Sequence, residues 1–391
     1  MKLRILVVGA GVSGIAAARG LLRDGHDVTV YDQRPNATAG GGAVTIWPNG
    51  ATVLDQLGVD MTGAGQRLSI VRVMTSSGRP IASLDLNTLV NRLGAPVRMV
   101  PRRVLLERLL DGFPADRIRC GARAVRVVDR PDGVRVDFED GSWDHGDLLI
   151  GADGLHSVVR DVVGAQPAKP TGWCSWQGLV TLAEVADPHV AVMMIGKHGN
   201  LGLWPAGGSN LQWWFDLPWS PSFVRPEKPL EMIRAHFSGW SDVVDEVLAT
   251  LTDDHLTPSP FPHFRHPIPP AGQGAVTLLG DAAHVMPPTL AQGTNQALLD
   301  AMVLRKALSD KRIGDHDIAG ALRWYENTRR RKVKAVSWVT TQQVSRGEAV
   351  LRPAALISDR FMTWALTRFL GWVSHRDISA EINQAALAEV S

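Results

Sequence analysis

The sequence contains very little cysteine and tyrosine. Its 391 residues include two cysteines, Cys120 and Cys174, and two tyrosines, Tyr31 and Tyr325. Two isolated cysteines argue against a disulfide scaffold and provide no metal-binding spacing, so we expect no metal ion. No tyrosine lies between residues 32 and 324, which argues against a tyrosine proton relay unless one of the two tyrosines reaches the site.

The chain also lacks an excess of charge and long apolar runs. The formal net charge is +2, with 45% hydrophobic and 20% charged residues. This composition is typical of a globular protein and gives no electrostatic reason to expect nucleic acid or an anionic membrane as a partner. No apolar run is long enough for a membrane span, and the N-terminus has no small-residue cleavage site before a glycine-rich turn. We therefore expect a cytoplasmic protein.

The N-terminal segment carries a glycine-rich phosphate-binding pattern. Residues 3–8 predict a strand, residues 9–14 read GAGVSG, and a helix and a second strand are expected to follow. The glycines allow a pyrophosphate to approach the backbone, and the helix N-terminus stabilises its charge. Asp32 ends the second strand, at the position where a carboxylate binds a ribose hydroxyl. Arg34 alone would suggest a 2′-phosphate, but the negative charge of Asp32 would repel that group. The pattern favours FAD or NAD over NADP.

Two later segments supply further pieces of a nucleotide site. Residues 147–160, DLLIGADGLHSVVR, predict a strand, turn and helix, with Asp153 organising the turn. Asp281 follows an apolar strand, where a carboxylate can accept a hydrogen bond from a ribityl hydroxyl. Residues 292–295, QGTN, open a helix whose N-terminus suits negative charge on a reduced flavin. His284 has two readings, as a catalytic residue or as a loop-structuring side chain.

In this order, the three segments resemble the group A flavin-dependent aromatic hydroxylases, which share the para-hydroxybenzoate hydroxylase fold. The resemblance covers residues 1 to about 340 and includes the segment IWPNG at 46–50. In the segment PRRVLL, the FAD-contacting arginine of the family aligns with Arg102, or with Arg103 if the alignment slips by one residue. One departure is Ala291, where the family often has glycine.

The resemblance implies non-covalent FAD as cofactor, NADH or NADPH as a transient co-substrate, and O2. The expected reaction is hydroxylation or epoxidation of an aromatic or polycyclic small molecule through a flavin C4a-hydroperoxide. The motifs and the resemblance together give these expected FAD contacts: Gly9, Gly11, Ser13, Gly14, Asp32, Arg34, Val44, Arg102, Val125, Asp153, Asp281, Gly293, Thr294 and Asn295.

The order of elements predicts an α/β fold with a Rossmann-type FAD-binding domain, an inserted mixed-sheet substrate domain and C-terminal helices. Residues 68–100 read as strands, and the Trp- and Pro-rich middle contains a strand-like run at 179–182. The predicted division assigns 1–70, 100–170 and 271–340 to the FAD-binding domain, 71–99 and 171–270 to the substrate-binding domain, and 341–391 to a C-terminal helical segment.

The substrate pocket is expected between the loop at 286–289 and the middle segment. Adjacent Trp213 and Trp214 face opposite sides of a predicted strand, and Trp214 is chosen for the pocket. An apolar aromatic pocket favours a flat, neutral, polycyclic or indole-like substrate over a small benzoate. No catalytic acid or base is identified. The pocket residues in the prediction are Met193, Trp204, Trp214, Met286 and Pro288, Phe215 is a further candidate, and His198, His236 or Gln177 are open candidates for contacting a substrate hydroxyl.

Three other functions remain as alternatives. A FAD-dependent reductase or dehydrogenase of an apolar substrate fits the apolar middle of the chain. A flavin halogenase is disfavoured because residues 172–178 have the wrong Trp spacing and lack Ile-Pro. A non-catalytic flavoprotein would need no intact Asp281. The C-terminal helices, with Trp338, Trp364 and Trp372, either cap the fold or form a dimer face, so monomer and homodimer are both open.

Overall fold

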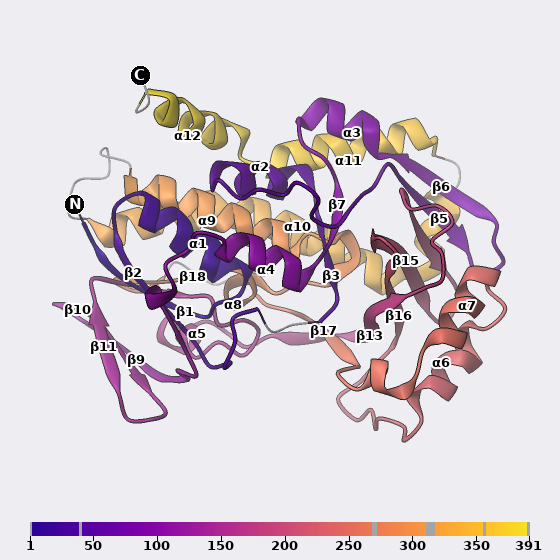
Figure 1. Cartoon of the computed structure of the whole chain (residues 1–391), viewed down its shortest axis with the longest axis horizontal. Coiled ribbons are helices and arrows are strands. Elements are labelled where there is room, and N and C mark those ends of the chain that lie inside the picture. Colours follow the sequence, from indigo (N-terminus) through magenta and orange to yellow (C-terminus); the bar gives the residue numbers. More distant parts are fainter. Residues whose placement is uncertain (1, 39–40, 268–271, 310–316, 355–356, 389–391) are drawn as a thin grey trace.

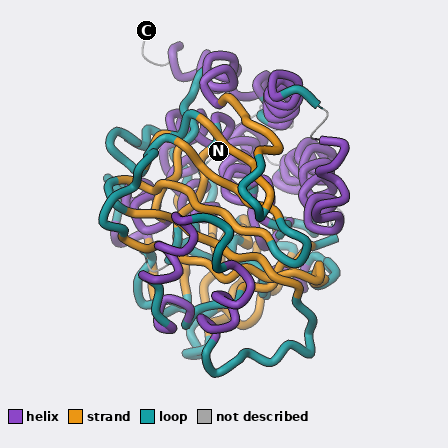
Figure 2. The backbone as a smooth tube through the Cα atoms, turned by 90° about the vertical axis from the view of Figure 1, so that its right-hand side faces the viewer, coloured by secondary structure: helices purple, strands orange, loops and turns teal. Residues whose placement is uncertain are grey.

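The computed structural model describes residues 2–38, 41–267, 272–309, 317–354 and 357–388, without the side chains of 343–354 and 385–388. Two large sheets lie side by side, with long helices running past them (Figure 1). Figure 2 is viewed from the end of the molecule that holds the larger sheet, and the strands of this sheet cross the picture between helices above and below them.

The first sheet is parallel and has the strand order β18-β12-β1-β2-β8. Helix α1 (Val12–Arg23) connects the adjacent parallel strands β1 and β2, which gives the expected βαβ unit. The strands are β1 (Arg4–Val8), β2 (Asp27–Asp32), β8 (Ile118–Cys120), β12 (Leu148–Gly151) and β18 (Val276–Leu278). The Rossmann-type prediction is therefore confirmed.

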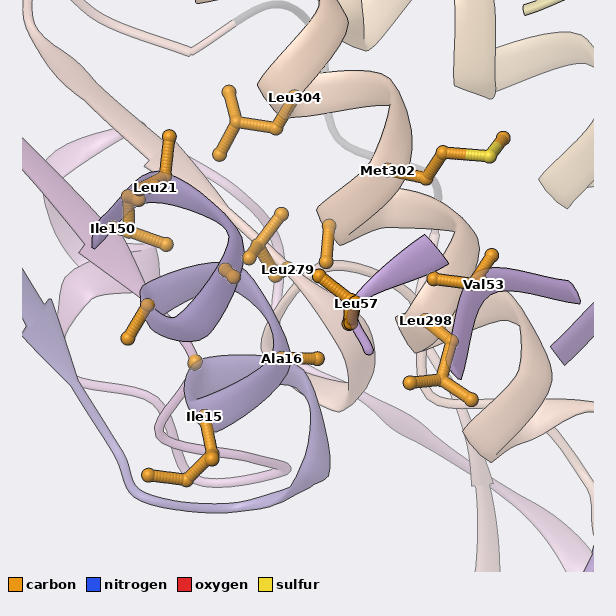
Figure 3. Packing of buried hydrophobic residues seen from close by; sticks show 14 of the residues in the cluster. Ile15, Ala16, Leu21, Val53, Leu57, Ile150, Leu279, Leu298, Met302 and Leu304 are labelled. Atoms are coloured by element: carbon orange, nitrogen blue, oxygen red, sulfur yellow. The ribbon is translucent and has the colours of Figure 1, made fainter. Parts of the chain in front are cut away.

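Successive side chains of β1 point to opposite faces of the parallel sheet, and each face packs into its own hydrophobic core. Ile5 and Val7 pack against α1 and against α2 (Pro48–Gln56), α4 (Arg102–Leu110) and α9 (Gly293–Ser309). Figure 3 shows this helix-covered core, in which side chains of α1, α2 and α9 meet. Leu6 and Val8 face the other way, because successive strand residues point to opposite faces. They pack against the sheet of β9 (Ala124–Arg130), β10 (Gly133–Phe138) and β11 (Trp143–Gly146), and near α5 (Val159–Val162).

The second large sheet has the order β17-β13-β16-β15-β14-β5-β6. Its strands are β5 (Ile70–Thr75), β6 (Pro80–Asp85), β13 (Lys169–Thr181), β14 (Val190–Ile195), β15 (Asn200–Gly207), β16 (Asn210–Pro218) and β17 (Phe261–Arg265). Helices α6 (Pro229–Phe237) and α7 (Asp242–Thr250) cover one face, followed by η2 (Asp253–Leu256). A small sheet of β3 (Ala43–Ile46), β7 (Arg98–Pro101) and β4 (Gln66–Arg67) joins the two parts.

One sequence-based assignment was wrong. Residues 86–93 form helix α3 (Leu86–Leu93) and not a strand, because Asp85 caps its N-terminus and Gly94 ends it with a left-handed φ of 82°. The predicted strand at 179–182 is present as the end of the longer strand β13, which starts at Lys169. Its first half pairs with β17, which is distant in sequence and therefore invisible to local patterns.

Among the described residues after α9, the chain forms the helices α10 (Ile318–Ala354), α11 (Asp359–Val373) and α12 (Arg376–Ala388). Helix α11 packs beside α3 and β6 (Figure 1). Trp338, Trp364 and Trp372 are 61%, 46% and 42% exposed. Within the described ranges, no helix combines the length and apolar character that crossing a membrane requires.

Candidate active site

The three sequence motifs meet at the carboxyl ends of β1, β12 and β18. Gly9 follows β1 so closely packed that an added Cβ would lie 2.3 Å from the carbonyl oxygen of Ala152. Gly280 opens α8 (Gly280–His284) after β18 with a φ of 55°, and its Cβ would lie 2.9 Å from Ser13 Oγ. The glycines at these two contacts let all three backbones approach one another.

The N-terminus of α1 forms a cradle that suits a pyrophosphate. A Cβ at Gly14 would lie 1.9 Å from the carbonyl oxygen of Gly9, so this glycine is required by the turn itself. A Cβ at Gly11 would meet no protein atom within 4 Å. Gly11 is the N-cap and offers no side-chain acceptor, so the first-turn N–H groups are available to an anion. The residues present therefore fit the diphosphate of FAD.

Asp32 and Arg34 form a paired site at the end of β2. Asp32 Oδ2 accepts a hydrogen bond from the Ala10 backbone N–H at 2.7 Å, and Oδ1 accepts from Arg34 Nε at 2.8 Å. Burial opposes ionisation of Asp32, but the hydrogen bonds from Arg34 and Ala10 outweigh it and lower its pKa. Arg34 thus faces a carboxylate, which disfavours a 2′-phosphate here.

The other expected FAD contacts lie on several different elements. Asp281 is exposed on α8, Val44 lies on β3, and Val125 is exposed on β9. The segment before β9 is attached to the end of β2, because the N–H groups of Gly121 and Ala122 donate to the carbonyls of Arg34 and Asp32. Asp153 accepts the Val158 N–H at 2.8 Å, as expected for a residue that organises its turn, and burial raises its pKa.

The two candidate arginines at the start of α4 differ in their partners. Arg103 pairs with Glu107 one turn later, at 3.3 Å. In the part of the chain that the structure describes, the Arg102 guanidinium has no hydrogen-bond or ion-pair partner. The Arg102 backbone N–H donates to the carbonyl of Gly42 at 2.9 Å, which anchors it beside the loop before β3. This difference favours Arg102 as the residue available to a cofactor.

Asn295 in the first turn of α9 connects three backbone segments. Its Oδ1 accepts the Trp47 N–H at 2.9 Å, and its Nδ2 donates to the carbonyls of Thr45 and Ala291, both at 2.9 Å. Both amide N–H donors and one acceptor position of Oδ1 are therefore occupied by the protein. Gly293 and Thr294 precede Asn295 at the helix N-terminus.

His284 belongs to a buried charge network. Its Nε2 lies 2.6 Å from Asp300 Oδ2, and Arg329 Nε donates to Asp300 Oδ1 at 2.7 Å. Asp300 also accepts the N–H of Gly280 at 2.9 Å. Burial alone would raise the pKa of Asp300, but the charges of His284 and Arg329 lower it to about 2. The network ties α8, α9 and α10 together, which favours the loop-structuring reading of His284.

The face of the seven-stranded sheet that carries Trp214 holds a cluster of aromatic and thioether side chains. Trp214 packs with Trp204, at 5.7 Å between ring centroids, in a cluster that includes Met193 and Met286. Within this cluster, the loop residue Met286 reaches the sheet, whereas Pro288 at the start of η3 (Pro288–Leu290) is exposed. The structure therefore brings four of the five predicted pocket residues together.

Trp213 and Phe215 point to the opposite face and pack under α6 and α7. The predicted alternation between Trp213 and Trp214 is confirmed, and Phe215 is wrong as a pocket candidate. His198 and His236 line a cavity of about 340 Å³ with Trp176, which belongs to that same opposite face. They are therefore not on the face of Trp214.

Sequence reasoning missed a buried polar cluster on three neighbouring strands. Ser175 on β13 contacts both Asp216 on β16 and His263 on β17. The three residues are 2%, 9% and 5% exposed. They are 41 and 88 positions apart in sequence, so no spacing rule could have joined them. The only sequence signal is that two polar residues, Ser175 and Asp216, interrupt apolar strands.

Comparison with known proteins agrees with this geometry. Residues 2–339 match the family described as FAD binding domain. The chain is 33% identical over 340 residues to the FAD-dependent urate hydroxylase of Klebsiella oxytoca, covering 85% of this chain and 87% of that protein. It is 35% identical over 337 residues to the 3-amino-4-hydroxybenzoate 2-monooxygenase of Streptomyces cremeus, covering 84% and 83% of the two chains.

A solved structure shows the same fold. The crystal structure of Klebsiella pneumoniae HpxO complexed with FAD and uric acid superposes with a TM-score of 0.83 at 28% identity, covering 94% of this chain and 96% of that one. Together with the cradle at α1, these matches show that FAD is the cofactor. The chain belongs to the FAD-binding family of group A flavin hydroxylases and is an FAD-dependent monooxygenase.

Proposed function

We propose that this monooxygenase uses NADH or NADPH and O2 to hydroxylate or epoxidise a flat, uncharged aromatic or polycyclic molecule that stacks on Trp214. The observation that carries this proposal is the position of the Trp214 ring over Gly202. A Cβ at Gly202 would lie 1.9 Å from Trp214 Cζ2, so the indole lies across the neighbouring strand. Gly202 and Trp214 are paired across β15 and β16, and Gln177 is the partner of Trp214 on β13.

The charge of this sheet face supports an uncharged ligand. On β13 to β16, the side chains that surround Trp214 on its own face are uncharged, apart from buried Asp216. Exposed Lys169 lies at the start of β13, eight residues before the partner of Trp214 on that strand. A carboxylate placed there would lose its hydration without gaining a cationic partner. Aromatic faces and thioethers instead favour a ring that stacks and fills space. A small dianionic acid therefore fits poorly.

The protein positions this face next to the cofactor site. Gln212, on the same face of β16 as Trp214, accepts the Ala43 N–H at 2.6 Å and so joins the sheet to the loop before β3. Bound FAD supplies the redox chemistry and the activation of oxygen. The chain itself stacks the substrate, excludes water with Met286 and Trp204, and holds the substrate edge near Gln177.

Product analysis tests this proposal. The purified holoenzyme is supplied with NADH or NADPH, isotopically heavy O2 and a panel of uncharged fused-ring aromatics, beside urate and 3-amino-4-hydroxybenzoate. The expected product carries one heavy oxygen atom, and NAD(P)H consumption rises when the true substrate is present. Strong turnover of a small dianionic acid, with none for larger aromatics, contradicts the proposed substrate class.

The same assay distinguishes the reductase or dehydrogenase alternative. That activity changes the hydrogen content of the substrate and inserts no heavy oxygen. The apolar cluster around Trp214 is compatible with such a substrate, so the isotope content of the product decides between the two.

A further inference from the structure

Ser175 is the centre of a hydrogen-bonded chain that runs across three strands. Its Oγ contacts the carboxylate of Asp216 and lies 2.7 Å from His263 Nε2. The His263 Nε2 to Asp216 Oδ1 distance is 3.9 Å, so Ser175 bridges the two groups. Among the described residues, His263 Nδ1 is buried and has no hydrogen-bond partner. The chain therefore has one open end, at Nδ1 of the imidazole.

The hydrogen-bonded chain of Asp216, Ser175 and His263 lies on the same face of the sheet as Trp214. Asp216 is two residues beyond Trp214 on β16, and Ser175 is two residues before Gln177 on β13. Residues two apart in a strand share a face and are separated by about 7 Å. Asn200, the cross-strand neighbour of Asp216 on β15, also has a buried Oδ1 without a partner in the described structure. A ring stacked on Trp214 would thus have its edge one row away from Ser175 and Asp216.

The hydrogen bonds among Asp216, Ser175 and His263 can run in two directions, and in both the Ser175 hydroxyl donates one hydrogen bond and accepts one. When Asp216 is ionised, the Ser175 hydroxyl donates to Asp216 and accepts a hydrogen bond from His263 Nε2–H. When Asp216 is protonated, its O–H donates to Ser175, the Ser175 hydroxyl donates to His263 Nε2, and the ring proton of His263 lies on Nδ1. Because a hydroxyl is both donor and acceptor, the direction of the whole chain reverses with one proton.

We propose that Ser175, Asp216 and His263 form a proton-accepting chain that takes the proton released by a ring O–H or N–H of the stacked substrate. This inference rests on the proposed function, and it supplies the acid–base group that the tyrosine-poor sequence lacks. The substrate O–H or N–H bond breaks, and the proton binds His263 Nδ1 directly or through one water. The Nε2 proton then moves to Ser175 Oγ, and the Ser175 proton moves to Asp216. The substrate ring, left anionic, is more electron-rich at the carbon that receives oxygen.

The electrostatic surroundings allow this transfer near neutral pH. Burial raises the pKa of Asp216 to about 7, and burial lowers the pKa of His263 to about 4, so the imidazole stays neutral while the carboxyl gains and loses the proton. Burial, and to a lesser degree the nearby charge of Asp216, raises the pKa of the Cys174 thiol to about 12, so the thiol stays protonated near neutral pH. Lys197 and Arg265, on the neighbouring elements, are exposed, as is His198.

The first test reads the imidazole directly and needs no turnover. In holoenzyme carrying isotope-labelled histidine, nitrogen chemical shifts report which ring nitrogen of His263 bears the proton. His263→Gln assigns the signal. We expect the proton to move from Nε2 to Nδ1 as the pH falls through the pKa of Asp216, without formation of a cation. Ser175→Ala should abolish this switch. A single tautomer at every pH, or an unchanged switch in Ser175→Ala, overturns the proton chain and leaves a purely structural cluster.

The second test asks whether the chain receives a substrate proton. A naphthol is bound to the holoenzyme without NAD(P)H, and difference absorbance measures its conversion to naphtholate. The wild type should lower the apparent pKa of the bound naphthol, and Ser175→Ala should bind it without this shift. Thr181→Val is the control, since Thr181 lies on the same strand and bonds to Asn210 instead. Binding with no shift in the wild type, or no binding, overturns the assignment to the substrate.

Turnover adds a third readout once a substrate with a ring hydroxyl is known. Ser175→Ala should reduce kcat by about a hundredfold at pH values where that hydroxyl is protonated. The loss should disappear above the pKa of the free substrate, because the proton is then already gone. An equal loss at every pH contradicts proton acceptance. If the wild type inserts no oxygen at all, the proposed function fails, while the tautomer switch still decides the fate of the proton chain.

Discussion

The indole ring of Trp214 lies against the backbone of Gly202, where an added Cβ would come within 1.9 Å of Cζ2. Gly202→Ala should therefore displace the Trp214 ring and remove the surface on which we propose that the substrate stacks. We expect KM to rise by about tenfold, equivalent to about 1.4 kcal/mol of binding, with a smaller effect on kcat. Steady-state kinetics with the substrate identified by product analysis measure this split.

The opposite face of the sheet provides a matched control. Gly178 on β13 pairs with Trp213, and its Cβ would lie 3.0 Å from Trp213 Cζ2. Gly178→Ala should cost stability through the core under α6 and α7 but leave KM unchanged. Equal changes in KM for the two variants would show that Trp214 has no special part in substrate binding.

Gly11→Ala separates cofactor binding from folding. Its φ of −75° is accessible to alanine, and the added Cβ meets no protein atom within 4 Å. The apoprotein should therefore unfold at the same urea concentration as the wild type. FAD affinity should fall by at least about tenfold, because the methyl group occupies the space where a pyrophosphate approaches. Titration of apoprotein with FAD measures the affinity.

Gly14→Ala is the contrasting variant. Its Cβ would lie 1.9 Å from the carbonyl oxygen of Gly9, so we expect the apoprotein itself to be destabilised. If Gly11→Ala bound FAD with wild-type affinity, the pyrophosphate would have to lie away from the start of α1.

Ala291 carries a strained backbone at the loop before α9. Its φ is 48°, in the left-handed region, which costs an L-residue with a side chain about 1–2 kcal/mol. Ala291→Gly removes this strain but adds about 0.5–1 kcal/mol of backbone entropy to the unfolded state. The net expectation is a gain of about 0.5–1 kcal/mol in unfolding free energy of the holoenzyme, measured by urea denaturation. A clear loss of stability would mean that the methyl group makes a contact worth more than the strain.

Sequence patterns predicted the parts of this molecule that local chemistry determines. The glycine-rich turn, Asp32 at the end of β2 and the opposite orientations of Trp213 and Trp214 all follow from residues close in sequence. The same patterns failed for helix α3, because its capping residues Asp85 and Gly94 lie in a stretch that otherwise alternates like strands.

The contacts that sequence could not provide join distant segments. The side chain of Asn295 forms hydrogen bonds with the backbones of Thr45 and Trp47, about 250 positions away, and no local pattern predicts these contacts. The cluster around Ser175 forms only because β13 lies between β16 and β17 in the sheet. The boundaries of the two predicted domains and the FAD contacts stay predictions.

Asp300 should make the stability of the protein depend on acid pH. Its folded pKa of about 2 lies below the ordinary 3.8, since His284 and Arg329 outweigh the cost of burial. A lowered carboxyl pKa gives stability that is complete above the unfolded value and is lost as pH falls towards the folded value. The lost stability is of order 2 kcal/mol between about pH 4 and pH 2.

Asp300→Asn isolates this contribution from that of other carboxyl groups. At neutral pH the free energy of unfolding of the variant should be about 3–5 kcal/mol lower than that of the wild type, because the Arg329 charge stays buried without its partner. The difference between wild type and variant, measured by urea unfolding of the holoenzymes, should be constant at neutral pH and shrink below about pH 4. Glu231→Gln, which removes an exposed pair with Lys228 at 3.0 Å, should change stability by less than about 1 kcal/mol. A difference for Asp300→Asn that stays constant down to the lowest pH would show that Asp300 keeps an ordinary pKa, and that its network stabilises the fold by hydrogen bonding without a net preference for the ionised form.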